Sequence, residues 1–150
     1  MSTTQIPERM NFSAVAPKVL KAVLALDAAA REGLDPVLLE LVQIRASQIN
    51  RCAYCIDYHT ADARRAGETE ERLHQLPAWR ESSLYTERER AALALTEALT
   101  LLPRGVSDEV YDEAATRFDE RELAQLIALV LTVNAWNRMN VATRKTPGTP

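Results

Sequence analysis

The sequence predicts an all-α protein, and three features of its composition support this. Ala and Leu are the commonest residues, only 4 of 150 residues are Gly, and aromatic residues make up 5%. Ala and Leu are strong helix formers, whereas a β-sheet protein needs frequent turns and β-branched strands. The length fits one domain. We therefore expect a single domain over residues 1–150, built as a bundle of six or seven helices, with flexible ends at about residues 1–11 and 143–150.

Turn and capping residues place the individual helices. Proline is favoured in the first turn of a helix and glycine just after its end, so Pro17 and Gly33 bracket the first helix. Asp35 caps the second helix, which Pro36 opens, and Thr86 with Glu89 forms a capping box. Pro77 breaks the chain into a loop before that box. The predicted helices cover about residues 17–30, 36–50, 52–66, 70–76, 86–102, 107–117 and 120–142.

The charge balance and the hydropathy pattern exclude several classes of protein. Lys and Arg total 18 against 21 Asp and Glu, a net charge of -3, so no strongly basic face for nucleic acid is expected. No apolar run reaches the roughly 18 residues of a membrane span. The polar start, which contains Pro7 and Glu8, does not have the pattern of a signal peptide. We expect a cytoplasmic protein that binds neither nucleic acid nor membrane.

Two cysteines and a histidine form the one pattern that indicates chemistry. Cys52 and Cys55 are three residues apart, and His59 follows Cys55 by four. On a helix with 100° per residue, the three side chains fall within about 60° of one another. One short helix therefore presents two thiols and an imidazole on one face.

This grouping suits a cycle of thiol oxidation and reduction. A cysteine attacks as its thiolate, and the first turn of a helix favours negative charge. A neighbouring histidine such as His59 can take the thiol proton. Once one sulfur is oxidised to a sulfenic acid, a second thiol can condense with it to give a disulfide.

Glu40 can reach His59 if the chain turns near Arg51. Helices before and after that turn would form an antiparallel hairpin. Glu40 lies 11 residues before the turn and His59 lies 8 after it, which is about 16 Å and 12 Å along the two helices. Side chains can span the difference of about 4 Å, so we expect a hydrogen bond, direct or through one water. Asp62 is the alternative partner, because it lies three residues after His59 on the same helix.

The spacing Glu40, Cys52, Cys55, His59 resembles the core motif of the alkylhydroperoxidase-D-like branch of the carboxymuconolactone decarboxylase family. The segment Trp136-Asn137-Arg138 also looks like that family, so the resemblance covers most of the chain.

The resemblance implies a thiol-dependent peroxidase or disulfide reductase with no bound cofactor. Cys55 would attack a hydroperoxide, Cys52 would resolve the sulfenic acid, and His59 would relay the proton under the influence of Glu40. An external dithiol, of the lipoyl type in the family, would reopen the disulfide. The family also implies a homo-oligomer, often a trimer or hexamer. The best-studied members carry a second His directly before the latter Cys, and this chain has Tyr54 there, which can donate a hydrogen bond but is no base near neutral pH.

Other interpretations stay open at this stage. Family members without the cysteine pair act as decarboxylases or on related lactones. The cysteines could instead be buried small side chains or ligands of a structural zinc ion, although the only spare histidine, His74, lies outside the usual spacing. A non-catalytic oligomeric module is the third alternative. We expect Trp136 in the core or an interface, and Arg138 as an ion-pair partner at the surface or in an interface.

The last predicted helix is apolar over much of residues 123–133. A helix that is apolar on all sides lies either at the centre of a bundle or against another subunit.

Overall fold

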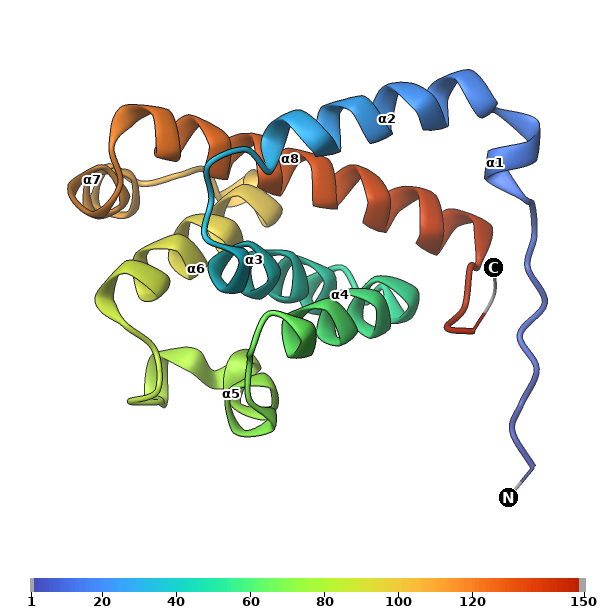
Figure 1. Ribbon diagram of the computed structural model, residues 1–150, viewed down its shortest axis with the longest axis horizontal. Coiled ribbons are helices and arrows are strands. Elements are labelled where there is room, and N and C mark those ends of the chain that lie inside the picture. Colours follow the sequence, from blue (N-terminus) through green and yellow to red (C-terminus); the bar gives the residue numbers. More distant parts are fainter. Residues whose placement is uncertain (1, 149–150) are drawn as a thin grey trace.

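The computed structural model describes residues 2–148, and these form an all-helical domain without strands (Figure 1). The described residues contain eight α-helices and two 3-10 helices, η1 and η2. Their bounds are α1 Phe12–Val15, α2 Pro17–Ala30, α3 Pro36–Ile49, α4 Ala53–Arg65, α5 Glu70–Gln75, η1 Leu76–Glu81, α6 Glu87–Thr100, η2 Leu102–Arg104, α7 Asp108–Arg117 and α8 Glu120–Thr143. The predicted all-α fold is confirmed, and α1 adds a helix to the seven placed from the sequence.

Side-chain caps explain where the main helices begin. The carboxylate of Asp35 accepts hydrogen bonds from the backbone of Val37 and Leu38, which satisfies free N–H groups at the start of α3. Thr86 forms the predicted capping box with Glu89 at the start of α6. Asp119 forms a second capping box at the start of α8. These predicted starts are confirmed to within one residue.

Two segments differ from the sequence prediction. Pro77 does not break the chain into a loop, because residues 76–81 continue from α5 as the 3-10 helix η1, in whose first turn a proline fits. Residues 12–15 form α1, which Asn11 caps by accepting a hydrogen bond from Ala14. A single turn of helix has too little hydrophobic periodicity to be recognised in a sequence.

The longest helix, α8, packs against α2, α3, α4, α6 and α7. In Figure 1, α2 runs alongside α8 at one edge of the molecule, and α3 and α4 lie on the other side of α8. Leu126, Leu129 and Val130 of α8 are buried in one core cluster with residues of α3 and α6. The side of α8 that carries Leu131 is exposed, so α8 is central without being enclosed. None of the described helices is long and apolar enough to cross a membrane.

The segment around Arg9 contacts the last turn of α8. The backbone N–H of Arg9 donates to the carbonyl of Thr143, and the Arg9 guanidinium donates to the carbonyl of Ala142. Arg144 adopts a left-handed conformation with φ of 55°, and the N–H of Lys145 then bonds back to the carbonyl of Asn140. These bonds hold the segment around Arg9 and the residues after α8 against the end of that helix.

Candidate active site

A sharp turn between α3 and α4 places the two cysteines. Arg51 has a φ of 56°, which allows the chain to reverse between the helices, and the predicted break at this residue is confirmed. The N–H of Cys52 donates to the carbonyl of Ser47 and ties the turn to α3. Cys52 is the N-cap of α4 and Cys55 lies in its first turn. We expected Cys52 inside the helix, but it lies one position before it.

The sulfur atoms of Cys52 and Cys55 are joined in a disulfide, with the two Cα atoms 5.3 Å apart. Both cysteines are almost fully buried. The N–H of Cys55 donates to the sulfur of Cys52 at 3.3 Å, so this backbone donor of the first turn is directed at Cys52. Among residues 2–148, no three side chains of His, Cys, Asp or Glu are grouped so that they could hold a metal ion.

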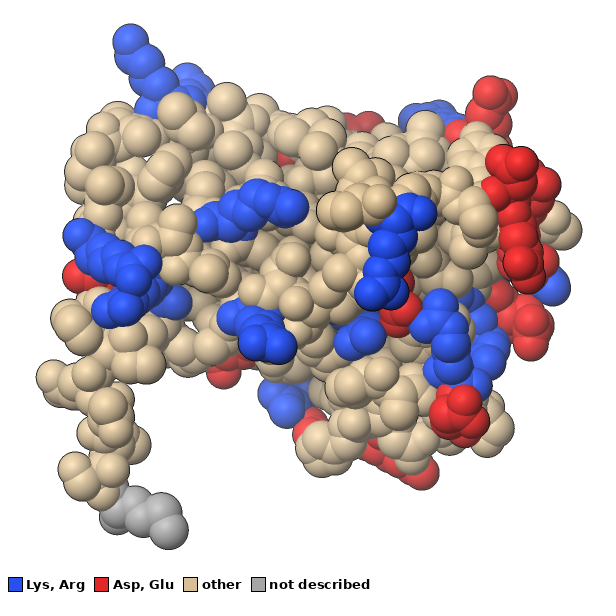
Figure 2. All heavy atoms as spheres, turned by 180° about the vertical axis from the view of Figure 1, so that it is seen from behind, with Lys and Arg blue, Asp and Glu red and all other residues tan. Residues whose placement is uncertain are grey.

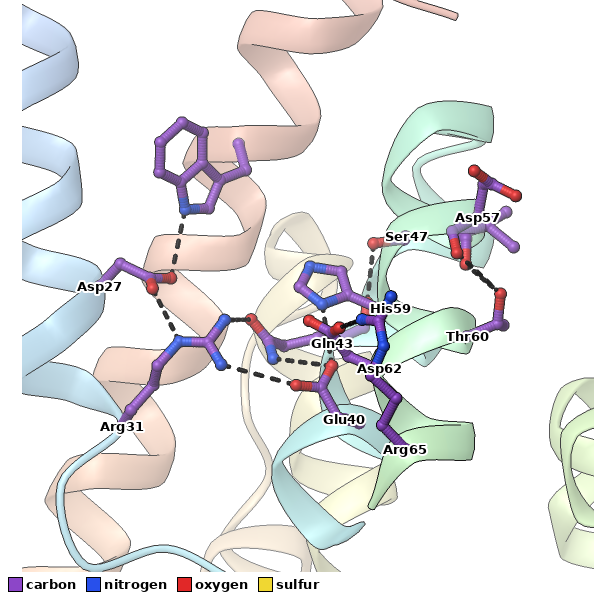
Figure 3. A network of polar contacts seen from close by, with 12 residues as sticks. Asp27, Arg31, Glu40, Gln43, Ser47, Asp57, His59, Thr60, Asp62 and Arg65 are labelled. Carbon is purple, nitrogen blue, oxygen red and sulfur yellow. Dashed lines mark hydrogen bonds and ion pairs between the residues drawn. The ribbon is translucent and has the colours of Figure 1, made fainter. Parts of the chain in front are cut away.

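Glu40 and His59 meet across the α3–α4 hairpin, as expected from the sequence. The Oε2 atom of Glu40 lies 2.9 Å from Nδ1 of His59, and both side chains are buried (Figure 3). The alternative partner, Asp62, forms an ion pair with Arg65 instead. Nδ1 of His59 is engaged by the carboxylate, which leaves Nε2 as the ring nitrogen available to a thiol.

Arg31 joins this pair and was not singled out from the sequence. Its guanidinium lies 3.5 Å from Glu40 Oε1 and donates to Gln43 Oε1 at 3.0 Å and to Asp27 Oδ2 at 2.7 Å (Figure 3). Gln43 in turn donates to Glu40 Oε2 at 3.3 Å. Burial on its own would lower the pKa of Arg31, but the hydrogen bond and charge of Asp27, followed by Glu40, outweigh it and raise the pKa. Arg31 therefore stays charged and holds the Glu40 carboxylate in place.

Asp27 also receives a hydrogen bond from the indole N–H of Trp136 at 3.2 Å. This contact links α2 to α8 beside the site, so the partly buried Trp136 has a polar role in addition to packing. A signal for Arg31 does exist in the sequence. After Lys21, the first helix is apolar except for Asp27, and Arg31 follows Asp27 at the spacing of an ion pair.

A cavity of about 540 Å³ lies beside these residues. Cys55 and His59 line it, whereas Cys52 and Glu40 do not. Helices α2, α4 and α8 supply most of the residues that line it, and Phe12 of α1 also lines it. One of the two cysteines and the histidine therefore border the same space.

Tyr54 lines this cavity next to Cys55. Its ring is stacked on that of Tyr58, with 6.3 Å between centroids, and Nζ of Lys145 lies 4.5 Å from its centroid. Tyr58 makes an edge-to-face contact with His59. Burial raises the pKa of Tyr58 above its ordinary value, with a smaller contribution from Asp62. The hydroxyl of Tyr58 is therefore neutral at pH 7.

A second residue missed in the sequence is Asn140. Its side-chain Nδ2 donates to the sulfur of Cys55 at 3.5 Å. No local pattern indicates this contact, because 85 residues separate the two positions and the contact depends on how the end of α8 packs on α4.

Other residues noted in the sequence lie outside the site. His74 is exposed and near Glu70. Arg138 donates to the backbone and side-chain oxygens of Asn134, one helical turn before it, so the expected ion pair is not the contact that it makes among the described residues.

The sequence matches a known protein family over more than half of its length. The model of the carboxymuconolactone decarboxylase family matches residues 17–98, which include Glu40, both cysteines and His59. The chain belongs to this family. It is 38% identical to the uncharacterised protein YdfG of Bacillus subtilis over 90% of this chain and 93% of that protein.

Solved structures place this family member in the alkylhydroperoxidase-D-like branch. A protein of unknown function from Agrobacterium tumefaciens, for which an antioxidant defence role as an AhpD has been suggested, has a TM-score of 0.92 and 32% identity. The comparison covers 96% of this chain and all of that one. The debrominase Bmp8 bound to 2,3,4-tribromopyrrole has a TM-score of 0.79 at 22% identity, over 89% of this chain and 72% of that one. At that identity, the likeness to Bmp8 shows the fold alone.

Proposed function

We propose that this family member is a thiol-dependent peroxidase that reduces hydroperoxides with the Cys52–Cys55 pair. The observation that carries the proposal is that Cys55 and His59 line one cavity. Their partners do not line it: Cys52 is bonded to Cys55, and Glu40 contacts His59 from behind. A substrate in the cavity can reach the sulfur of Cys55 and the imidazole together. The second sulfur is already at bonding distance from the first.

The chemical cycle follows from these positions. In the reduced protein, His59 takes the proton of the Cys55 thiol, and the thiolate attacks the terminal oxygen of a hydroperoxide ROOH. The O–O bond breaks, an S–O bond forms, and His59 returns the proton to the leaving alkoxide, so that ROH leaves and Cys55 becomes a sulfenic acid. The thiol of Cys52 then displaces water from that sulfur and forms the disulfide.

An external dithiol closes the cycle. It supplies two electrons and two protons by thiol–disulfide exchange, and it leaves as its own disulfide. The cavity favours Cys55 as the sulfur that is attacked, because Cys52 does not line it. By its family, a lipoyl-type dithiol is the reductant that we propose.

The cavity favours an organic hydroperoxide over hydrogen peroxide. A water molecule takes up about 30 Å³ of liquid volume, so hydrogen peroxide would fill a small part of a space of about 540 Å³. Apolar side chains line much of that space, among them Leu20, Leu24 and Trp136. These walls suit the alkyl or aryl part of a hydroperoxide.

The direct test is consumption of cumene hydroperoxide with dihydrolipoamide as reductant. We expect turnover by the wild type and by Asp57→Asn, a change on the exposed side of α4, and only background consumption by Cys55→Ser. Equal consumption by the wild type and Cys55→Ser would remove Cys55 from the reaction.

The buried Glu40–His59 pair favours a second candidate, because a carboxylate and an imidazole can perform acid–base chemistry without any thiol. A decarboxylase or lactone-processing enzyme would use that pair alone. Turnover of such a substrate by the double variant Cys52→Ser with Cys55→Ser would support this function over the peroxidase.

We also propose that the protein is a homo-oligomer that works in the cytoplasm. Large apolar side chains of α2 and α8 are exposed, including Val19 at 50%, Leu24 at 52% and Leu131 at 61%. Figure 2 shows acidic side chains gathered at the end of the molecule where α7 lies, and beside it a broad surface with only isolated Lys and Arg. A surface of this kind suits contact with further copies, and sedimentation equilibrium would give the number of subunits.

A further inference from the structure

The two cysteines of this site receive different help from the start of α4. The backbone N–H of Cys55 points to the sulfur of Cys52 at 3.3 Å, and Cys52 occupies the N-cap. This N–H group and the positive end of the helix dipole can therefore stabilise negative charge on Cys52. Cys52, however, does not line the cavity. The observed backbone donor is thus bonded to the sulfur that does not line the cavity, and Cys55 receives its hydrogen bond from elsewhere.

Asn140 supplies a donor at the required place. Its Nδ2 lies 3.5 Å from the sulfur of Cys55, and its side chain also lines the cavity. A disulfide sulfur is a weak acceptor, whereas a thiolate is a strong one. The amide is thus already aimed at the sulfur that carries the negative charge when Cys55 is a free thiolate, a form of preorganisation that enzymes use at reacting atoms.

The end of α8 fixes the position of this amide. The carbonyl of Asn140 accepts the N–H of Lys145, and the left-handed turn at Arg144 makes this bond possible. The hydroxyl of Thr143 bonds to the carbonyl of Met139 in the same turn. Asn140 is therefore held on an ordered helix end and not on a mobile loop.

We propose that Asn140 is a catalytic residue that stabilises the thiolate of Cys55 by a hydrogen bond from Nδ2. The inference rests on the proposed role of Cys55 as the attacking sulfur. The same bond acts in both halves of the cycle. It stabilises the thiolate that attacks the hydroperoxide, and it stabilises Cys55 when this sulfur leaves as a thiolate in the second exchange with the external dithiol.

Charged groups around the cavity do not replace this contact. The cavity lining contains two carboxylates, Glu8 and Asp27, and two cations, Arg31 and Lys145. Arg31 is occupied by Asp27, Glu40 and Gln43, and Lys145 lies over the ring of Tyr54. The other titratable groups in the lining are His59, Tyr54 and Tyr58. Substitutions of Asn140 by neutral residues leave all of these charges in place.

The thiol pKa of Cys55 tests the proposal. In a Cys52→Ser background, Cys55 is the only thiol, and its rate of alkylation by iodoacetamide follows the thiolate fraction over pH. We expect two variants to move the midpoint of this profile upward by about one pH unit. Asn140→Leu keeps the branched outline of the side chain without its N–H donor, and Asn140→Ala removes most of the side chain. That shift corresponds to a roughly tenfold smaller thiolate fraction below the midpoint. Val141→Ala, at the neighbouring exposed position of α8, is the matched control and should leave the midpoint unchanged.

An unchanged midpoint in a folded Asn140 variant would overturn the proposal, and two variants of different size ensure that a folded one can be measured. The experiment needs no peroxide, so it separates the two proposals. If the wild type consumes no hydroperoxide but the midpoint moves, the peroxidase function fails and the contact stands. If the wild type turns over and the midpoint does not move, the contact plays no part in activating Cys55.

Discussion

The carboxylate of Glu40 lies 2.9 Å from Nδ1 of His59, although the two residues come from opposite arms of a helical hairpin and are 19 positions apart. Both are buried, so the hydrogen bond fixes the orientation of the imidazole and its tautomer. The other ring nitrogen is then free for the thiol of Cys55. In the proposed mechanism, this relationship makes the buried His59 a proton acceptor with a defined direction.

Replacing Glu40 by Gln should slow peroxide reduction by about tenfold, since the neutral amide no longer supports a protonated His59. The change keeps the shape of the side chain. The measurement is kcat/KM for cumene hydroperoxide across pH 5 to 9. Asp62→Asn serves as the control, because Asp62 pairs with Arg65 and not with His59. An effect of Asp62→Asn as large as that of Glu40→Gln would show that the wrong carboxylate has been assigned.

Arg31→Met should weaken both the fold and the activity. It removes the cation that contacts Asp27, Glu40 and Gln43, and leaves two buried acceptors of α3 without their donor. We expect the free energy of unfolding to fall by about 1–3 kcal/mol, measured by urea denaturation. Arg65→Met, which removes an exposed ion pair with Asp62, should cost less than about 0.5 kcal/mol.

A double-mutant cycle decides whether Arg31 acts through Glu40. If it does, the fold-loss of kcat/KM in the double variant will be smaller than the product of the fold-losses caused by Arg31→Met and Glu40→Gln alone. Fully multiplicative losses would mean that the two residues act independently, and Arg31 would then be a structural residue only.

Tyr54→His should raise the rate of peroxide reduction several-fold, because it adds a base beside Cys55 where the tyrosine has none at neutral pH. Tyr54→Phe keeps the stacking on Tyr58 and should leave the rate within about twofold of wild type. A faster Tyr54→Phe variant, or a Tyr54→His variant no faster than wild type, would contradict the idea that the lack of a base at position 54 limits the rate of peroxide reduction.

Glu97 gives a prediction for acid stability far from the site. It accepts hydrogen bonds from Trp79 at 2.7 Å, Arg45 at 3.0 Å and Arg80 at 2.6 Å. Burial on its own would raise the pKa of Glu97, but these three donors outweigh it and the pKa is lowered. Its contribution to stability is therefore present above the pKa of the unfolded state and is lost as the pH falls through the lower, folded value.

Glu97→Gln should consequently destabilise the protein at pH 7 by about 1–3 kcal/mol and by much less at pH 3, below the ordinary pKa of a glutamate. Urea unfolding at the two pH values measures both numbers. Glu113→Gln, which removes an exposed pair with Arg117, is the control and should change neither. A loss that is equal at pH 7 and pH 3 would show that the charge of Glu97 is not what stabilises this cluster.

The sequence predicted the helices and the central pair well because local signals determine them. Asp35-Pro36 and the capping box of Thr86 specify helix starts through contacts within four residues. The Glu40–His59 contact followed from helix rise alone once the turn at Arg51 was recognised. Each of these predictions needed only one short stretch of chain.

Contacts that depend on packing between distant helices could not be predicted in the same way. Asn140 reaches Cys55 across 85 positions, and Trp136 reaches Asp27 across 109. Their positions depend on how α8 packs against α2 and α4. The two cysteines also differ, because Cys55 lines the cavity and Cys52 caps the helix. Predicting this difference would have required the exact residue at which α4 begins. Sequence patterns place such boundaries only to within a few residues.

Intact-protein mass spectrometry after one equivalent of organic hydroperoxide tests the central claim most directly. The reduced wild type should lose two hydrogen atoms as the disulfide forms and regain them with a dithiol, while Cys52→Ser should gain one oxygen atom on Cys55. Cys55→Ser should stay unchanged over the same time. Oxidation of Cys55→Ser at the wild-type rate, or a wild type that keeps both thiols, would contradict the account.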